Sequence, residues 1–443
     1  MGRQLSVSLD IPLDERFDVI VAGGGPAGCT AAAAAARGGA KTLLIEATGT
    51  LGGMGTSGLV PAWCPFSDQE RIIYGGLAAQ VFAKAKEGMA HVAPSDMDWV
   101  PIDAERLKRV YDDLVTDAGA TVLFHTFVGG VQMAQSGVVD TLLLANKAGL
   151  GAYRAKVFVD CTGDGDLSVW AGAPYAKGDD QTGELMPVTH CFVLSNVDEY
   201  GYRFGEPFHQ GIRSILAAGK HPLIADSHSC NNIVGPGTVG FNSGHMWEVD
   251  NTSPETVSRA MMQGRKIAAE FRDALAEWNP RAYGNAFLAA TGALMGVRET
   301  RRVIGDYILT ADDYFARRSF ADEIGRNSYP IDIHTAKSEI TASRQGTLNV
   351  MERYENFGKG ESHGIPYRCL TPKGVRNVLI AGRSVSCDRP VQASIRTMPN
   401  CLVMGEAAGL AAAMAARAPA ADVHAVDTAA LRRGLKAAGA YLP

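Results

Sequence analysis

The clearest pattern of apolar and polar positions lies near the start of the chain. Residues 17–46 read FDVIVAGGGPAGCTAAAAAARGGAKTLLIE, in which two short apolar runs flank a glycine-rich turn and an alanine-rich stretch. The apolar runs predict strands, and the stretch from about Pro26 to Arg37 predicts a helix. Alanine suits a helix packed tightly on a sheet, because its small side chain lets the backbones approach. The segment therefore predicts a β-turn-α-β unit.

A second amphipathic pattern follows at residues 103–118, where Leu107, Val110, Leu114 and Val115 fall on one helical face. The next apolar run, TVLFHT, is expected to form the third strand of a parallel sheet. Short β-like runs then predict a small meander that returns the chain to this sheet.

The end of the chain resumes the style of its beginning. The run NVLIAG at 377–382 predicts a strand, and residues 399–417 predict an alanine-rich helix. The segment between has a different character, with aromatic-rich loops and one long helical pattern at 254–278. We expect an α/β fold in which a nucleotide-binding Rossmann-like domain is built from both ends and an α+β substrate domain is inserted. The expected parts are residues 1–173 (with 54–100 an excursion toward the substrate), 174–370 and 371–443.

Composition narrows the classes of function. The 443 residues include 42 basic and 47 acidic side chains, a net charge of −5 that disfavours nucleic acid or an anionic membrane as partner. The first sixteen residues are polar, and no apolar run approaches membrane-spanning length, so we expect a cytoplasmic protein without membrane insertion. The eight cysteines show no C-x-x-C spacing, so no metal site is expected.

The glycine turn has the context of a dinucleotide-binding site. Gly23, Gly25 and Gly28 fit G-x-G-x-x-G between a strand and a helix. Gly23 permits the tight turn, Gly25 lets backbone N–H groups meet phosphate, and Gly28 lets the helix lie close to the sheet. The helix N-terminus adds partial positive charge. The second strand ends at Glu46, whose carboxylate suits two ribose hydroxyls and would repel a 2′-phosphate, which disfavours NADP.

The loop after Glu46 bears on the choice between NAD and FAD. It reads ATGTLGGMGTSG, whereas NAD-binding folds usually pass straight into the next helix. The glycines indicate a backbone that wraps a longer ligand, and the apolar Leu51, Met54 and Leu59 indicate burial. Two further segments, VFVDCTGDGDLSVWAG and the C-terminal strand and helix, add to this picture. These segments indicate a ligand that extends beyond the adenosine.

These four segments, together with MGVRETRRVIGDYILTADD, SYPIDIH, GIPYRCLTPKGVRNVLIAGRSVS and IRTMPNCLVMGEAAG, resemble the FAD-dependent oxidoreductase family of the glutathione-reductase-like flavoprotein superfamily, including its fumarate-reductase-like relatives. The resemblance that these segments carry implies FAD, with an NAD-dependent dehydrogenase as the alternative. It implies that Glu46 binds the adenosine ribose, that the Gly52–Gly53 loop contacts pyrophosphate and ribityl, and that Val128 contacts adenine through its backbone. It also implies that the start of the C-terminal helix faces the flavin N1 and C2 carbonyl. One departure is Arg383, which stands where many members carry an acid that holds a ribityl hydroxyl.

The residues expected to bind FAD are Gly23, Gly25, Pro26, Ala27, Gly28, Glu46, Ala47, Gly52, Gly53, Met54, Gly55, Thr56, Val128, Thr162, Gly163, Asp164, Gly382, Arg383, Arg396, Met398, Pro399 and Asn400. The glycine loop contains no histidine, the residue that often attaches FAD covalently in fumarate-reductase relatives. We therefore expect noncovalent FAD, and a packed thiol at Cys64.

Candidate catalytic residues are His334, His245, Arg301 and Tyr329. The run Arg298-Glu299-Thr300-Arg301-Arg302 would place Arg298 and Arg302 on one strand face and Arg301 on the other. One face suits a carboxylate, a phosphate or the cofactor; the alternative is a structural network with Glu299.

The stretch SYPIDIH, at 328–334, would place Tyr329 on one face and Asp332 with His334 on the other. A neutral histidine suits proton removal from an alcohol. His245 is the rival base, and His190 is expected to face the core.

The pattern predicts an oxidoreductase that moves a hydride between a small polar substrate and flavin N5. Oxidation of a CH–OH group in a sugar or hydroxy acid is favoured, because a histidine base suits an alcohol. A CH–CH reductase or desaturase of a small carboxylic acid is the alternative within the class, because the arginine run suits an anion. A non-redox or RNA-modifying flavoprotein is a further alternative. The electron acceptor or donor is unidentified, and a homo-oligomer is possible.

Overall fold

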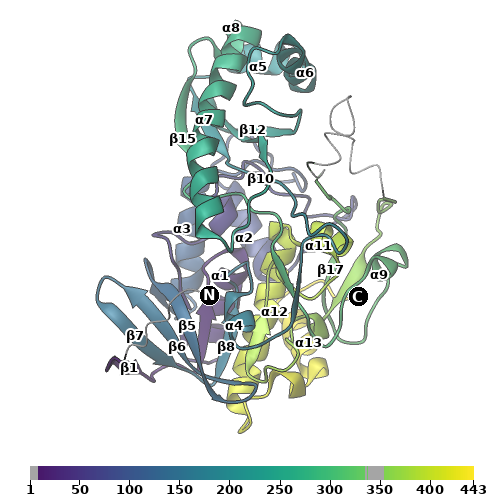
Figure 1. Cartoon of the computed structure of the whole chain (residues 1–443). Helices are drawn as coiled ribbons and strands as arrows, with labels where there is room; N and C mark the ends of the chain where they lie inside the picture. The colour runs from purple at the N-terminus through teal and green to yellow at the C-terminus, as the bar shows by residue number, and fades with distance from the viewer. Residues whose placement is uncertain (1–7, 335–336, 338–353) are drawn as a thin grey trace.

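A five-stranded parallel sheet forms the centre of the protein. The computed structural model describes residues 8–334, 337 and 354–443 (Figure 1). The sheet has the order β19-β8-β2-β3-β4, and every neighbouring pair in it is parallel. Its strands are β19 (Val378–Ile380), β8 (Val157–Asp160), β2 (Val19–Ala22), β3 (Thr42–Ile45) and β4 (Thr121–Leu123). Because β19 lies beside β8, the sheet joins the two ends of the chain, as the sequence predicted.

Helices from both ends pack on this sheet or against the helices that cover it. They are α1 (Pro26–Arg37), α2 (Leu77–Lys86), α3 (Ala104–Thr116), α12 (Met398–Arg417) and α13 (Thr428–Ala437). Figure 1 shows purple α1 close to yellow α12, and the Thr30 hydroxyl of α1 donates to the Leu402 carbonyl of α12 at 2.7 Å. The buried faces of both helices are rich in alanine, which explains this close approach.

The predicted meander forms a second sheet beside the parallel one. Its order is β1-β7-β6-β5, with β5 (Phe127–Gln135), β6 (Val138–Asn146) and β7 (Gly149–Arg154) antiparallel and β1 (Leu13–Asp14) parallel to β7. The chain then enters β8 and the short helix α4 (Asp166–Trp170). The meander therefore leads the chain back to the centre of the molecule.

The inserted segment builds a separate antiparallel sheet with its own apolar core. The sheet order is β12-β13-β11-β15, and Figure 1 shows it with its helices at the top of the view. The strands are β11 (Phe192–Ser195), β12 (Ser229–Gly235), β13 (Thr238–Ser243) and β15 (Phe287–Thr291). The helices are α5 (Glu199–Phe204), α6 (Phe208–Ala218), α7 (Pro254–Trp278) and α8 (Pro280–Tyr283).

Short elements connect the two bodies. The paired strands are β9 (Tyr175–Lys177) with β16 (Arg301–Val303), β10 (Val188–Thr189) with β14 (His245–Met246), and β17 (Glu323–Asn327) with β18 (His363–Pro366). The short helices are η1 (Gly53–Gly55), α9 (Ala311–Phe315), η3 (Tyr367–Cys369), α11 (Arg389–Ile395) and η4 (Val423–Ala425). Buried side chains at 309–333 and 357–370, such as Leu309 and Ile365, join the core of the parallel-sheet body, whereas the separate core of the inserted body spans residues 188–297. The exact bounds 1–173, 174–370 and 371–443 stay a prediction. Among the helices of the described residues, none is long and apolar enough to cross a membrane.

Candidate active site

A cavity of about 820 Å³ lies where the carboxyl ends of the parallel strands face the inserted body. Gly23 follows β2, Glu46 follows β3, Cys161 follows β8 and Gly382 lies two residues after β19; all four line the cavity. This edge is where open α/β sheets bind their ligands. The cavity also reaches Met398 at the start of α12, so one space joins the N-terminal glycine turn to the C-terminal helix.

Most of the residues predicted to bind FAD line this cavity, and seven do not. The lining residues are Gly23, Gly25, Pro26, Ala27, Glu46, Ala47, Gly53, Met54, Val128, Thr162, Gly163, Gly382, Arg383, Arg396 and Met398. The remaining predicted residues, Gly28, Gly52, Gly55, Thr56, Asp164, Pro399 and Asn400, are not among the lining residues. The assignment of both groups to FAD binding stays a prediction.

The glycine turn is tightly packed at Gly23 and Gly28 and open toward the cavity at Gly25. Gly23 has a φ of +97°, and a Cβ there would lie 2.7 Å from the Cys161 carbonyl carbon. A Cβ on Gly28 would overlap the Gly23 carbonyl oxygen, so Gly28 packs the helix on the turn. A Cβ on Gly25 would meet nothing within 4 Å, which shows open space at the cavity wall. Gly25 is also the N-cap of α1 and receives no side-chain cap, so its end of α1 presents free N–H donors to this space.

The side chains around the turn are held in place by hydrogen bonds. The two carboxylate oxygens of Glu46 accept from the backbone N–H groups of Gly24 and Thr48, both at 2.7 Å. Glu46 is 9% exposed and lines the cavity, so its position suits hydroxyl donors of a ribose. Asp164 accepts from Arg383 Nη2 at 2.8 Å and therefore orients the arginine that replaces the usual acid.

The far end of the cavity is rich in unsatisfied donors. Thr397, the N-cap of α12, makes no side-chain cap hydrogen bond, and Met398 begins the helix at the cavity wall. Arg383 Nε and Arg396 Nε are buried and have no hydrogen-bond partner in the part of the chain that the structure describes. Buried donors normally have acceptors, and a pyrophosphate and an isoalloxazine ring carry many. The residues present therefore fit an elongated flavin dinucleotide. Asn400, behind them, donates to Asn327 Oδ1 at 2.8 Å.

Three histidines gather at the substrate end of the cavity, and two of them are the rival bases of the sequence. His245 Nε2 lies 3.0 Å from His334 Nδ1. His245 Nδ1 lies 2.5 Å from Asp226 Oδ2, and His334 Nε2 lies 3.3 Å from Asp332 Oδ2. The groups form one chain in the order Asp226, His245, His334, Asp332. Arg396 Nη2 donates to Asp332 Oδ2 at 3.4 Å, so the chain ends beside the start of α12.

The shifts in pKa show which of these four hydrogen-bonded groups are charged at pH 7. Burial lowers the pKa of His334 to about 4 and that of His245 well below its usual range, so both imidazoles are neutral at pH 7. Burial raises the pKa of Asp226 to about 6. Burial opposes ionisation of Asp332 as well, but His334 and Arg396 lower its pKa well below the usual range.

With both imidazoles neutral, the four hydrogen-bonded groups have one proton fewer than they have contacts. Three contacts join the four groups, whereas two neutral imidazoles supply one N–H each. One added proton would satisfy every contact, with an imidazolium held between a neighbouring ring and a carboxylate. The arrangement is therefore suited to accept a proton from a group in the cavity.

The same histidines offer a poor geometry for a metal ion. One ligand nitrogen of each of His228, His245 and His334 lies within 4.8 Å of the others. However, the rings of His228 and His245 are stacked 4.0 Å apart at 8°, so their in-plane lone pairs run parallel and do not converge. His228 Nε2 is also taken by Arg298 Nη2 at 3.1 Å. The prediction that the protein has no metal site stands as a proposal.

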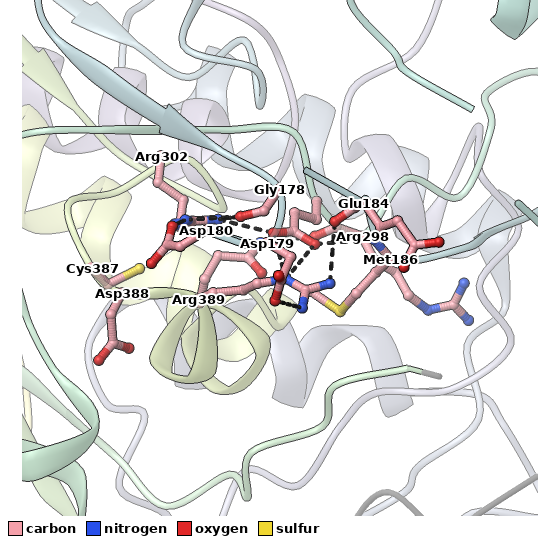
Figure 2. Close-up of polar contacts among 12 residues, drawn as sticks. Gly178, Asp179, Asp180, Glu184, Met186, Arg298, Arg302, Cys387, Asp388 and Arg389 are labelled. Atoms are coloured by element: carbon pink, nitrogen blue, oxygen red, sulfur yellow. Dashed lines mark hydrogen bonds and ion pairs between the residues drawn. The ribbon is translucent and has the colours of Figure 1, made fainter. Parts of the chain in front are cut away.

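The arginine run divides into three separate roles. Arg298 lines the cavity. Arg301, predicted to be catalytic, instead pairs with Asp166 at 2.7 Å and does not line the cavity. Arg302 donates to Glu299 at 2.9 Å in a buried network that includes Arg389 (Figure 2). The expected pairing of Arg298 with Arg302 on one strand face was wrong, because the regular strand begins only at Arg301.

The stretch at 328–334 also differs from the expected alternation. It forms no strand, and Tyr329, Asp332 and His334 all line the cavity. The Tyr329 hydroxyl donates to Asp332 Oδ2 at 3.2 Å, so Tyr329 is not on the opposite face. His190 is buried against the Gly292 carbonyl oxygen, as expected for a core histidine.

Comparison with known sequences identifies the family. Residues 18–435 match the profile of the FAD dependent oxidoreductase family, which covers nearly the whole chain. The chain belongs to this family. It is an FAD-dependent oxidoreductase, and the predicted cofactor is confirmed.

The oxidoreductase is 30% identical over 223 residues to the thiamine thiazole synthase of Methanococcus aeolicus, a match that spans 43% of this chain and 80% of that protein. A solved geranylgeranyl bacteriochlorophyll reductase-like protein from Thermoplasma acidophilum is 16% identical over 97% of this chain and 85% of its own, with a TM-score of 0.49. CabE, an aromatic hydroxylase from angucycline biosynthesis, is 14% identical over 95% of this chain and 68% of its own, with a TM-score of 0.47.

Several cavity residues of the oxidoreductase carry no signal in the sequence. His228 and Asn242 line the cavity, and Asp226 contacts the lining residue His245; all three come from the inserted body and belong to no recognisable motif. The sequence marked Arg298 only as one of three arginines within residues 298–302. Their contacts with one another and with His245 form when residues 226–298 fold together, which no local pattern in the sequence marks.

Proposed function

We propose that this oxidoreductase oxidises the CH–OH group of a small polar substrate, a sugar or a hydroxy acid, and that the paired His245 and His334 take the hydroxyl proton. The observation that supports this proposal is the 3.0 Å contact between the two histidines, which line the same cavity as the glycine turn. Bound FAD supplies the two-electron acceptor. As the O–H and C–H bonds break and a carbonyl forms, the proton enters the histidine chain and the hydride leaves the carbon.

The residues beside the two histidines have distinct parts in this proposal. Asp226 fixes the orientation and tautomer of His245, because an ionised carboxylate accepts the Nδ1–H. The carboxylate of Asp332 stabilises the positive charge of His334 when that ring is protonated. Tyr329 and Arg396 hold Asp332 in place. Arg396 and the positive end of α12 place positive potential beside the cofactor. Noncovalent attachment is proposed because burial raises the pKa of the Cys64 thiol to about 12, which leaves it unreactive.

One observation favours a second reaction. Arg298 and Arg396 are among the arginines that line the cavity, and such groups would also hold a small unsaturated or saturated carboxylic acid. Reduction or desaturation of a CH–CH bond is therefore the second candidate. A cytoplasmic location, a homo-oligomer and a separate electron acceptor remain part of the proposal, without a role in its test.

Anaerobic titration of the purified holoprotein tests the proposal. Sugars, hydroxy acids and unsaturated or saturated acids would be added separately while the flavin absorbance is followed. Bleaching by CH–OH compounds, with formation of the matching carbonyl product, is the expected result. Bleaching by saturated acids alone, or reoxidation of chemically reduced flavin by unsaturated acids alone, would favour the second candidate instead.

A further inference from the structure

Arg298 is a buried cation without an anionic partner among the residues that the structure describes. Three arginines in the described ranges have less than 9% of their surface exposed: Arg298, Arg302 and Arg326. Arg302 pairs with Glu299 at 2.9 Å and Arg326 with Glu323 at 3.1 Å. No carboxylate of the described residues lies within 4.0 Å of Arg298. A buried charge is normally paired, so this guanidinium lacks the group that the other two have.

The contacts of Arg298 hold it in place without neutralising it. Nη1 donates to the Pro187 carbonyl oxygen at 2.9 Å and to the Thr189 hydroxyl at 2.8 Å. Nη2 contacts His228 Nε2 at 3.1 Å and Asn242 Oδ1 at 3.4 Å. All four acceptors are neutral, and Arg298 lines the cavity. Burial and the charge of Arg396 lower the pKa of Arg298 to about 10, so it is still charged at pH 7.

His228 adds a second donor to the same place. Arginine has no acceptor atom, so His228 Nε2 must accept the hydrogen bond from Arg298. The proton of the neutral ring then sits on Nδ1, which has no hydrogen-bond partner among the described residues. Burial lowers the pKa of His228 well below its usual range, which agrees with a neutral ring. His228 lines the cavity, and its ring is stacked on His245.

We propose that Arg298 and the Nδ1–H of His228 form a subsite for a substrate carboxylate, so that the substrate is a hydroxy acid and not a neutral sugar. The inference rests on the proposed oxidation of a CH–OH group. Because His228 stacks on His245 at 4.0 Å, the carboxylate subsite adjoins the base. This neighbourhood favours a hydroxyl on the carbon next to the carboxylate, which oxidation would convert to a 2-oxo acid.

Matched pairs of acids and neutral compounds test the subsite. The probes are glycolate against ethylene glycol, lactate against propane-1,2-diol, and gluconate against glucose. Binding is measured as the change in the flavin spectrum of the holoprotein, and turnover as anaerobic bleaching. Acetate, which has a carboxylate and no hydroxyl, reports binding without turnover. The variants are Arg298→Gln, Arg298→Lys and His228→Gln, and Arg265→Gln is the control because Arg265 is exposed on α7.

The subsite predicts that at least one acid binds at least about 30-fold more tightly than its neutral partner, and that Arg298→Gln abolishes this preference. Arg298→Lys should retain part of it, and the control should retain all of it. Equal binding of acids and neutral partners, or unchanged acid binding in an Arg298→Gln holoprotein with a normal flavin spectrum, would overturn the subsite. If Arg298→Gln does not fold, Arg298→Lys and His228→Gln decide by the same criterion.

The two proposals fail in different ways. Acids that bind in an Arg298-dependent manner but never bleach the flavin would retain the subsite and refute CH–OH oxidation. A neutral polyol that bleaches the flavin equally in wild type and Arg298→Gln would support the oxidation and refute the subsite.

Discussion

His245 Nε2 and His334 Nδ1 lie 3.0 Å apart, although 89 residues separate them in the chain. The sequence presents these two histidines as rivals for one role. Their contact makes them parts of one unit, because protonation of either ring changes the hydrogen bond that the other makes. The unit continues to a carboxylate on each side, Asp226 and Asp332.

The first prediction concerns the histidine pair. His334→Gln and His245→Gln should each lower the rate constant of flavin reduction by about 10²-fold or more, because each interrupts proton uptake. The double variant should lose little more than the worse single variant, since both remove the same unit. Anaerobic stopped-flow absorbance with the substrate found by titration measures these rates. His209→Asn, at an exposed position of α6, is the control; independent losses that multiply would contradict a shared unit.

The second prediction concerns pH. The pKa of Asp226 is raised to about 6 by burial, so below that pH its carboxyl is protonated and above it the carboxylate accepts the His245 Nδ1–H. The rate of flavin reduction should therefore rise as pH increases through about 6, while His334, with a pKa of about 4, stays neutral. The pH profile of flavin reduction should lose this rise in Asp226→Asn. A rise that persists in that variant would assign the titration to another group.

The third prediction separates two glycines of the turn. Gly28→Ala should destabilise the apoprotein by about 1–3 kcal/mol, because its Cβ would overlap the Gly23 carbonyl oxygen. Gly25→Ala should leave apoprotein stability nearly unchanged, since its Cβ meets nothing within 4 Å, but should weaken FAD binding by about 10-fold or more. Thermal unfolding of apoprotein and titration with FAD measure the two effects. The reverse pattern would show that Gly25 packs the fold and Gly28 meets the ligand.

The fourth prediction lies outside the cavity. Burial raises the pKa of Glu406, on α12, from 4.5 to about 7, while its Oε2 accepts from the Leu77 N–H at 2.8 Å. The native state therefore holds a proton that the unfolded chain releases between pH 4.5 and about 7, so the free energy of unfolding falls as pH rises through this interval. Across that interval the free energy of unfolding falls by about 3 kcal/mol.

Glu406→Gln keeps an oxygen for the Leu77 N–H and removes the titration. The variant should gain stability over wild type as pH rises, by about 3 kcal/mol near pH 8 relative to the difference near pH 4.5. Chemical denaturation of both proteins across this pH range measures the gain. A stability difference that does not change with pH would mean that Glu406 titrates near its ordinary value in the folded protein.

Local patterns in the sequence predicted the parts of the fold that depend on local physics. The helix at Pro26–Arg37 has the predicted bounds, because strand, glycine turn and alanine face are all contiguous. The predicted alternation of faces at 328–334 was wrong, because an alternating pattern of only seven residues also fits an irregular segment held by side chains. Asp226 and His228 were missed, since they meet His245 only through the folding of the inserted body, and no local pattern in the sequence marks that contact.

The position of β19 beside β8 has a consequence for how the protein is made. The Phe158 N–H donates to the Asn377 carbonyl oxygen at 2.9 Å, so this pairing closes a loop of more than two hundred residues. Loops of this length form slowly during folding. While the ribosome is still adding residues before 377, the edge of β8 has no neighbour on that side and is open to wrong pairing. The nascent protein is therefore expected to depend on chaperones until its last strand emerges, and to acquire its cofactor only after that.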